Sequence, residues 1–216
     1  IIPDFHNTKK RLDRFFADVD ADPVGRVAEV GPEIAFLREN RDLCSKLSED
    51  AAAGRIPLRV THNDTKINNV LFDAETGEPL TVIDLDTVMP GLSVHDFGDA
   101  VRFAASTAAE DEPDVSKISL DLDKYRAFAE GFVGETASAL TDAEIDAMAL
   151  GAVTITFELA SRFLDDYITG DKYFKVNYPG HNLVRTRAQL KLASDMLEKY
   201  DRMQAIVREI AEKNKP

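Results

Sequence analysis

A single strand-rich stretch, residues 56–91, interrupts a chain whose apolar residues otherwise recur with helical spacing. Before it, Leu12, Phe15, Phe16 and Val19 form the i, i+3, i+4, i+7 stripe of an amphipathic helix. Inside the stretch the apolar period shortens towards two, which is typical of strands. The pattern predicts an α+β fold, mostly helical, in which a small β-hairpin or sheet carries the loops between its strands.

Helices are predicted on both sides of this stretch. Two helical patterns fill the first 55 residues; Thr8 is expected to cap the first, and Gly54 follows the second, as glycine commonly does. Amphipathic segments follow at residues 95–106, 122–134, 142–169 and 183–212. We expect a single domain, residues 1–216, made of a helical segment (1–55), a segment with the catalytic and metal loops (56–91) and a helical subdomain (92–216).

Three short strands are predicted within the stretch, at residues 56–61, 69–73 and 80–84. A strand–loop–strand–turn–strand order places the polar residues that end each strand at one edge of a small sheet. We therefore expect Asp64, Asn69 and Asp84 to lie close together there, on loops held by a rigid scaffold.

Composition limits the classes of partner. The 216 residues carry a net charge of −13, which disfavours nucleic acid or an anionic membrane as the main partner, because both require clustered Lys and Arg. The one cysteine, Cys44, lies in a helical pattern and is expected to be buried and inert. No signal peptide or run of eighteen apolar residues is recognisable, so a cytoplasmic location is expected.

The polar residues of the stretch suit the transfer of a phosphoryl group. Residues 62–69 read H-N-D-T-K-I-N-N, and protein kinases use H-R-D-x-x-x-x-N followed by a metal-binding Asp. In this interpretation Asp64 takes the proton of an acceptor hydroxyl and Lys66 neutralises charge on the transferring phosphate. Asn69 and Asp84 supply the hard oxygen ligands that Mg²⁺ prefers. His62 is expected to hold the loop by hydrogen bonds rather than to act as a base.

These residues resemble those of the aminoglycoside phosphotransferase and choline kinase superfamily, small-molecule kinases with a protein-kinase-like fold. The loop of that superfamily commonly reads His-Gly-Asp-x-His-x-x-Asn, and this chain departs from it at Asn63 and Lys66. The sequences T-H-N-D-T-K-I-N-N-V-L at 61–71 and I-D-L-D-T-V-M-P-G at 83–91 are most similar to the N-acetylhexosamine 1-kinase branch.

The likeness extends to residues 3–8 and 157–167 and so covers most of the chain. It implies a kinase that uses ATP and Mg²⁺ to phosphorylate the anomeric hydroxyl of an amino sugar such as N-acetylglucosamine or N-acetylgalactosamine. It also implies roles for particular residues: Asp64 as base, Asn69 and Asp84 as metal ligands, Thr65, Asp86 and Arg162 as sugar contacts, and Asp96 as a buried brace of the catalytic loop. Asp86 could instead orient the metal loop. A structural ion pair with Asp165 or Asp166 is an equally good explanation for the presence of Arg162 in this helix.

The sequence features of a nucleotide-binding lobe are not recognisable in this chain. Kinases of this fold hold ATP with a Gly-rich loop and a strand lysine, but the eleven glycines include no G-x-G pair. The sequence starts at Ile1 without Met, and the first strand is predicted only near residue 57. We therefore expect the C-terminal lobe of a kinase-like fold, with the N-terminal lobe absent, and no kinase activity from this segment alone.

Other functions stay open at this point. Within the same class the acceptor could be choline, an aminoglycoside, homoserine or another sugar. A metal-dependent hydrolase using Asp64, Asp84 and Asp86 would require a second metal-binding cluster, and the four histidines lack metal-ligand spacing. A non-catalytic interaction module would be expected to have lost one of the key groups.

Overall fold

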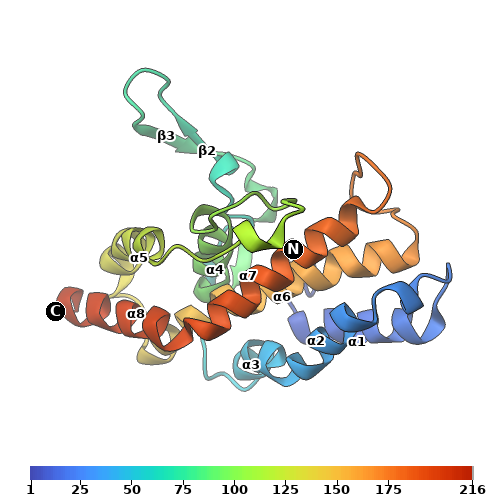
Figure 1. Cartoon of the computed structure of the whole chain (residues 1–216). Helices are drawn as coiled ribbons and strands as arrows, with labels where there is room; N and C mark the ends of the chain where they lie inside the picture. Colours follow the sequence, from blue (N-terminus) through green and yellow to red (C-terminus); the bar gives the residue numbers. More distant parts are fainter. Residues whose placement is uncertain (216) are drawn as a thin grey trace.

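The longest helix, α6 (Asp142–Thr169), runs through the centre of the molecule, and the other long helices pack around it (Figure 1). The computed structural model describes residues 1–215. A capping box starts α6: Thr141 Oγ1 accepts from the Glu144 N–H at 3.2 Å, and the Glu144 carboxylate accepts from the Thr141 N–H at 2.9 Å. Gly170, with φ 103°, ends it in the left-handed conformation. By length and composition α6 could cross a membrane, but 89% of its most apolar window is buried inside the protein, as in a core helix.

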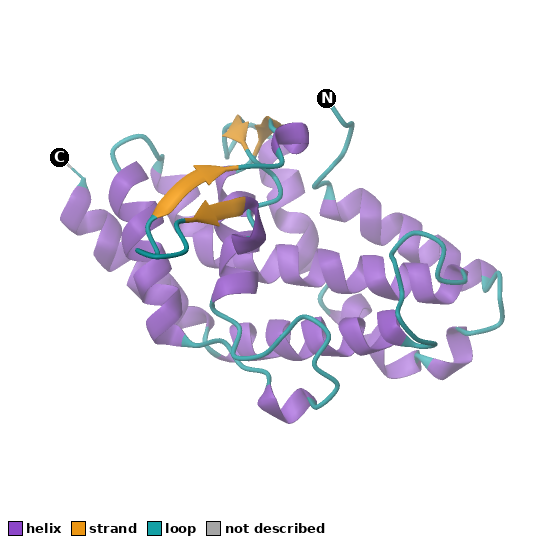
Figure 2. Cartoon of the chain, turned by 90° about the horizontal axis from the view of Figure 1, so that it is seen from above, coloured by secondary structure: helices purple, strands orange, loops and turns teal. Residues whose placement is uncertain are grey.

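The remaining elements surround this axis. The other helices are α1 (Thr8–Ala21), α2 (Gly31–Glu39), α3 (Arg41–Ala52), α4 (Ser93–Ala104), α5 (Leu122–Thr136), α7 (His181–Glu198) and α8 (Tyr200–Asn214). The 3-10 turns are η1 (Val27–Glu29), η2 (Ile67–Asn69), η3 (Leu85–Thr87) and η4 (Val115–Lys117). The strands are β1 (Arg59–Thr61), β2 (Val70–Phe72), β3 (Pro79–Val82) and β4 (Met89–Gly91). Figure 2 shows the strands grouped over one part of the helical body.

The strands form two separate antiparallel pairs, and the expectation of one three-stranded sheet is wrong. β1 pairs with β4, with Val60 opposite Pro90, and β2 pairs with β3, with Val70 opposite Val82. β4 was not predicted, because the sequence at 89–91, M-P-G, has neither alternation nor strong strand formers. The third strand also ends earlier than expected, at Val82, two residues before Asp84.

Three helix boundaries differ from the sequence-based expectation. Asn7, not Thr8, caps α1: its side chain accepts from the Lys10 N–H at 3.1 Å, while Thr8 is buried inside the first turn. A break at Asn40 divides the second helical pattern into α2 and α3. A break at Lys199 divides the predicted 183–212 helix into α7 and α8. Each interruption lies within a continuous amphipathic pattern, which does not reveal a change of helix direction.

The backbones of α4 and α6 touch where the two helices cross. A Cβ added to Gly98 would lie 2.5 Å from the Gly151 carbonyl oxygen, and one added to Gly151 would overlap the Val94 carbonyl. Real Cβ atoms do not approach backbone so closely, so the two glycines are required for this crossing. The contact places α4, which follows the strand-rich stretch, directly on the core helix.

We expect Gly151→Ala to destabilise the protein by about 1–3 kcal/mol, because the added methyl group must push α4 away from α6. Urea denaturation measures the change. Gly131→Ala is the matched control: Gly131 lies in α5 with no atom within 4 Å of a built Cβ. That control should be neutral or stabilising by up to about 1 kcal/mol, since Ala is the better helix former. Equal effects of the two substitutions would contradict the close crossing.

The β2–β3 hairpin projects from the helical body (Figure 1) and exposes apolar side chains on both strands. The exposed set is Leu71, Phe72, Leu80, Val82 and Ile83. By contrast, Cys44 is buried as predicted, and burial raises the pKa of its thiol to about 12, so it is not a nucleophile at neutral pH.

Candidate active site

Asp96, near the start of α4, holds the loop between β1 and β2 through hydrogen bonds to its backbone. Asp96 Oδ2 accepts from the His62 N–H and Oδ1 from the Asn63 N–H, both at 2.7 Å. Burial raises the pKa of the Asp96 carboxyl, and the two backbone N–H bonds oppose that shift. This is the bracing position expected from the sequence. Thr65 also bonds to this helix, since its hydroxyl donates to the Asp96 carbonyl at 2.7 Å.

Asn63 turns the chain immediately before Asp64. Its φ is 66°, a left-handed conformation that asparagine tolerates better than most residues. The Asn63 side chain donates to the Thr87 carbonyl at 2.9 Å and so ties the loop to the segment before β4. Asn63 therefore tolerates the positive φ and adds a bond from its side chain that a glycine could not form.

Asp64, Lys66 and Asn69 lie together in the loop after β1. Lys66 Nζ lies 3.0 Å from Asp64 Oδ1. Asn69 Nδ2 donates to the Asp64 carbonyl at 2.8 Å and to Asp64 Oδ2 at 3.2 Å. The carboxylate is thus oriented by one cation and one amide, and it stays partly exposed at the cleft described below. A carboxylate so placed can accept a proton from a bound hydroxyl.

Asp84 joins this group through the backbone. The Ile83 N–H donates to the Asn69 carbonyl at 2.9 Å, and the Ile83 carbonyl is 3.1 Å from His62 Nε2. Because His62 Nδ1 faces the Asp64 N–H at 3.3 Å, Nε2 carries the proton and donates. His62 therefore links the catalytic and metal loops, a structural role. Asp84 itself has φ 60°, a conformation that non-glycine residues keep where the surroundings impose it.

The donor set at Asn69 and Asp84 fits Mg²⁺. The Asn69 amide nitrogen is committed to Asp64, which leaves its oxygen available, and Asp84, whose side chain is exposed, follows the Ile83 N–H that donates to the Asn69 carbonyl. One carboxylate and one amide oxygen are hard ligands, and Mg²⁺ commonly takes only one or two protein ligands together with phosphates and water. Within residues 1–215 there is no group of three or more His, Cys, Asp or Glu arranged to hold a metal.

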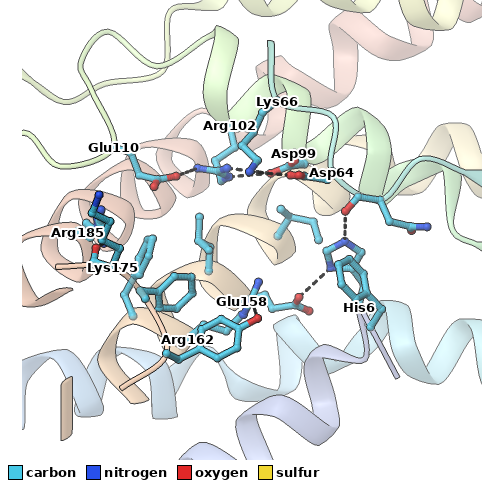
Figure 3. Close-up of a pocket in the computed structure, with 17 residues that line it drawn as sticks. His6, Asp64, Lys66, Asp99, Arg102, Glu110, Glu158, Arg162, Lys175 and Arg185 are labelled. Atoms are coloured by element: carbon cyan, nitrogen blue, oxygen red, sulfur yellow. Dashed lines mark hydrogen bonds and ion pairs between the residues drawn. The ribbon is translucent and has the colours of Figure 1, made fainter. Parts of the chain in front are cut away.

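A cleft of about 380 Å³ opens beside Asp64 and Lys66, between α4, α6 and the segment after α6 (Figure 3). This volume lies within the range of small-molecule sites, roughly 300–1,000 Å³. Arg102 forms one wall; it is 3% exposed and pairs with Asp99 at 2.9 Å and Glu110 at 2.8 Å. Sequence reasoning missed this wall, because no motif singles out an Asp and an Arg three residues apart on a helix.

Arg162 lies on the opposite wall and faces aromatic rings, not a carboxylate. Its guanidinium is 5.7 Å from the centre of the Tyr173 ring and 5.3 Å from that of Phe174. Asp166 accepts from the backbone N–H groups of residues 172, 173 and 174 at 2.8–2.9 Å, and no ion pair joins Arg162 to Asp165 or Asp166 among residues 1–215. The alternative of such an ion pair is wrong. Asp166 instead shapes the loop that brings the two rings to the cleft.

His6 connects the N-terminal segment to both the core helix and the catalytic loop. Nδ1 is 2.9 Å from Glu158 Oε1, and Nε2 is 3.0 Å from the Asn63 carbonyl. Both partners only accept, because the pKa of Glu158 is lowered to about 2: burial raises it, but His6, Arg11 and Thr8 outweigh burial. Both ring nitrogens must therefore donate, and His6 is an imidazolium. Burial alone would lower the pKa of His6, yet Glu158 raises it above the ordinary value.

We expect His6→Gln to lower stability by about 1–2 kcal/mol below pH 6.5, because two charge-assisted contacts are weakened. The folded pKa of His6 is raised, so its contribution is complete below the unfolded pKa, near 6.5, and is lost as pH rises through the folded pKa. Urea denaturation of both proteins from pH 5.5 to 9 measures the difference. A difference that stayed constant across this range, or an NMR titration of His6 at or below pH 6.5, would refute the charged assignment.

Two predicted sugar contacts lie outside the cleft. The Thr65 hydroxyl donates to α4, and Asp86 is exposed on η3; neither is among the residues that line the cleft.

Glu158, which lines the cleft, was not predicted as a site residue. A carboxylate inside the buried run of α6 was a usable signal, because a charge in a core helix requires a partner. Tyr173 had no sequence signal, since only the Asp166 loop brings it to the cleft.

The fold and site together define a class of protein. The mostly helical body with small antiparallel strand pairs is consistent with the C-terminal lobe of a kinase-like fold. The sequence matches the model of the phosphotransferase enzyme family over residues 2–131. The match covers more than half of the chain, so the chain belongs to this family. Such enzymes transfer phosphoryl groups to small molecules, using ATP and typically Mg²⁺.

Proposed function

We propose that the chain is the acceptor-binding and metal-binding part of a kinase that phosphorylates the anomeric hydroxyl of an N-acetylhexosamine. The observation that carries the proposal is the position of Asp64 at a cleft whose other wall combines an arginine with aromatic rings. The family match ends at residue 131, before α6, so the acceptor must be argued from the cleft itself and from the resemblance of residues 61–71 and 83–91 to amino-sugar 1-kinases.

The cleft suits a sugar by its chemistry. Arg162, Tyr173 and Asp99 offer hydrogen-bond donors and acceptors around the cavity, and Phe174 and Leu159 add apolar surface. Sugars present both kinds of surface, because hydroxyl groups lie at the edge of the ring and C–H groups on its faces. Small-molecule sites typically combine mostly apolar walls with a few polar groups that fix orientation.

In the proposed reaction each residue of the loop has one task. Asp64 accepts the proton of the anomeric hydroxyl as the oxygen attacks the terminal phosphorus of ATP, the bond from that phosphorus to the bridging oxygen breaks, and ADP leaves. Lys66 stabilises charge on the phosphoryl group in transit. Asn69 and Asp84 would hold Mg²⁺, which when bound neutralises phosphate charge. Asp96 and His62 keep the loop in position.

The exposed apolar face of the β2–β3 hairpin supports a further part of the proposal. In this proposal a nucleotide-binding lobe packs on that face and completes the ATP site. Large exposed apolar patches are typical of surfaces that another domain or protein covers. A cytoplasmic location, where ATP is available, is part of the same proposal.

The test is a panel assay with ATP and Mg²⁺. N-acetylglucosamine, N-acetylgalactosamine, choline, homoserine and an aminoglycoside are offered to the chain alone and to the chain with any residues that its gene encodes before Ile1. We expect sugar 1-phosphate from the two amino sugars, and no turnover by the chain alone. Phosphorylation of choline, homoserine or the aminoglycoside in preference to the sugars would refute the proposed acceptor. Release of phosphate from a phosphoester without any acceptor would favour the hydrolase alternative.

A further inference from the structure

The acceptor cleft carries an excess of positive charge, although the whole chain has a net charge of −13. Every carboxylate that lines the cleft contacts a neighbouring cation, with Arg102 shared between two of them. These pairs are Asp64 with Lys66, Asp99 and Glu110 with Arg102, and Glu158 with His6 and Arg11. The negative charge of the protein therefore lies outside this cavity.

Three further cations line the same cleft without a carboxylate partner within residues 1–215: Arg162, Lys175 and Arg185. They come from three segments, since Arg162 lies on α6, Lys175 in the following loop and Arg185 on α7. Figure 3 shows Lys175 and Arg185 together at the end of the cleft away from His6. Cations in an acidic protein usually find carboxylates, so three without one in a single cavity require an explanation.

The two arginines are held in place by neutral groups. The Arg185 guanidinium lies 5.3 Å from the centre of the Phe163 ring, and its Nη1 donates to the Lys175 carbonyl at 3.1 Å and to Asn182 Oδ1 at 3.3 Å. Arg162 lies over Tyr173 and Phe174. Stacking on rings fixes a guanidinium while leaving most of its five N–H donors free. Both guanidinium groups are thus held in position, while most of their N–H donors have no hydrogen-bond partner in the described part of the chain.

We propose that the end of the cleft that carries Lys175 and Arg185, with Arg162 further along towards Glu158, is a subsite for an anionic group, a phosphate or a carboxylate, of the bound ligand. Arginine matches the geometry of both groups, and a half-buried cleft strengthens the attraction relative to open solvent. The inference rests on the proposed function, because it takes this cleft as the acceptor site. It predicts that amino sugars with an anionic substituent away from the anomeric hydroxyl are preferred over neutral ones as acceptors.

The same charges disfavour two of the alternative acceptors. An aminoglycoside is polycationic, and choline is a quaternary ammonium that binds to open aromatic faces. Here guanidinium groups already cover rings of Phe163, Tyr173 and Phe174. A cationic acceptor would meet like charges that have no compensating carboxylate.

Calorimetric binding to the full chain, without nucleotide, tests the subsite. The probes are N-acetylglucosamine, its 6-phosphate and inorganic phosphate, each at low and high salt. We expect the 6-phosphate to bind about tenfold more tightly than the neutral sugar at low salt, and the advantage to shrink at about 0.5 M salt. Arg185→Gln should reduce it to roughly threefold or less, and Lys175→Gln, at an exposed side chain, should reduce it without risk to folding.

Lys124→Gln is the matched control, because it removes the same charge from an exposed position on α5 outside the cleft. It should leave the tenfold ratio unchanged. If inorganic phosphate binds as tightly as the sugar phosphate and competes with it, the subsite stands and the anion belongs to a second molecule. Equal binding of neutral and anionic sugars, or a ratio that neither cleft variant changes, overturns the subsite. That failure is distinct from failure of the proposed function, which would appear as no phosphoryl transfer to any amino sugar.

Discussion

Asp64→Asn is expected to lower kcat by at least about a thousandfold while leaving acceptor affinity within about threefold. Asparagine has almost the same shape but cannot take the proton that the hydroxyl must lose, and a positioned general base typically contributes 10²–10⁴-fold. The loop itself should persist, because the braces at His62 and Asn63 come from Asp96. The ion pair with Lys66 is partly exposed, so its loss costs little stability.

The measurement is sugar 1-phosphate formation with ATP and Mg²⁺, made on the form of the protein that is active in the panel assay. Calorimetric binding of the sugar and a thermal unfolding curve accompany it for each variant. Glu75→Gln serves as control, because it removes one negative charge at the exposed tip of the β2–β3 hairpin. It should leave kcat unchanged. A rate for Asp64→Asn within tenfold of the parent would remove Asp64 from the mechanism.

Glu158→Gln is expected to destabilise the protein by about 3–5 kcal/mol at pH 7, the range for removing one partner of a buried ion pair. Glu158 is 2% exposed, accepts from His6 and from Thr8 at 2.6 Å, and forms an ion pair with Arg11 at 3.2 Å. Glutamine leaves His6 and Arg11 without a counter-charge. Since His6 also bonds to the Asn63 carbonyl, the damage should extend to the catalytic loop and lower kcat as well as stability.

The pH dependence separates loss of charge from loss of packing. The pKa of Glu158 is lowered to about 2 in the folded protein, so its contribution is complete above the unfolded value, near 4.3, and is lost as pH falls towards 2. Urea denaturation at pH 7, 5, 4 and 3 should show the gap between parent and variant closing in acid. Glu130→Gln, exposed on α5, is the control and should shift stability by less than about 0.5 kcal/mol. A gap that does not change with pH would mean that Gln fails for reasons of packing.

The sequence was sufficient for the parts of the fold that depend on local periodicity. The long helix over 142–169 was predicted at its true boundaries, because Thr141 and Gly170 are strong start and stop signals. The pairing of β1 with β4 was not predictable, since the partners lie about thirty residues apart and β4 has no strand-like pattern of its own. Strand partners depend on the body that the strands rest on, which periodicity does not describe.

The candidate site divides in the same way. Asp64, Lys66 and Asn69 lie within eight residues of one another, so a loop motif was enough to group them. The cleft, in contrast, brings His6 together with Glu158 and Tyr173, residues that only helix packing makes neighbours. Thr65 and Asp86 were expected to touch the sugar from their place in the motif, yet the structure directs the first to α4 and leaves the second on the surface.

The glycine contact between α4 and α6 fixes the dimensions of the catalytic chamber. Asp96 lies on α4 and holds the catalytic loop, and Arg162 lies on α6 and forms one wall of the cleft. At the crossing, the backbones of these two helices meet with no side chain between them. Two surfaces in direct backbone contact cannot approach further, and the glycines leave no side chain that could act as a spacer. If this cleft is the acceptor site, a change of acceptor size is therefore expected to come from the lining residues of the loop after α6, at 173–175, and not from closer approach of the helices. Substitutions that alter acceptor choice are accordingly expected in that loop, whereas the glycines at the helix crossing tolerate almost no substitution.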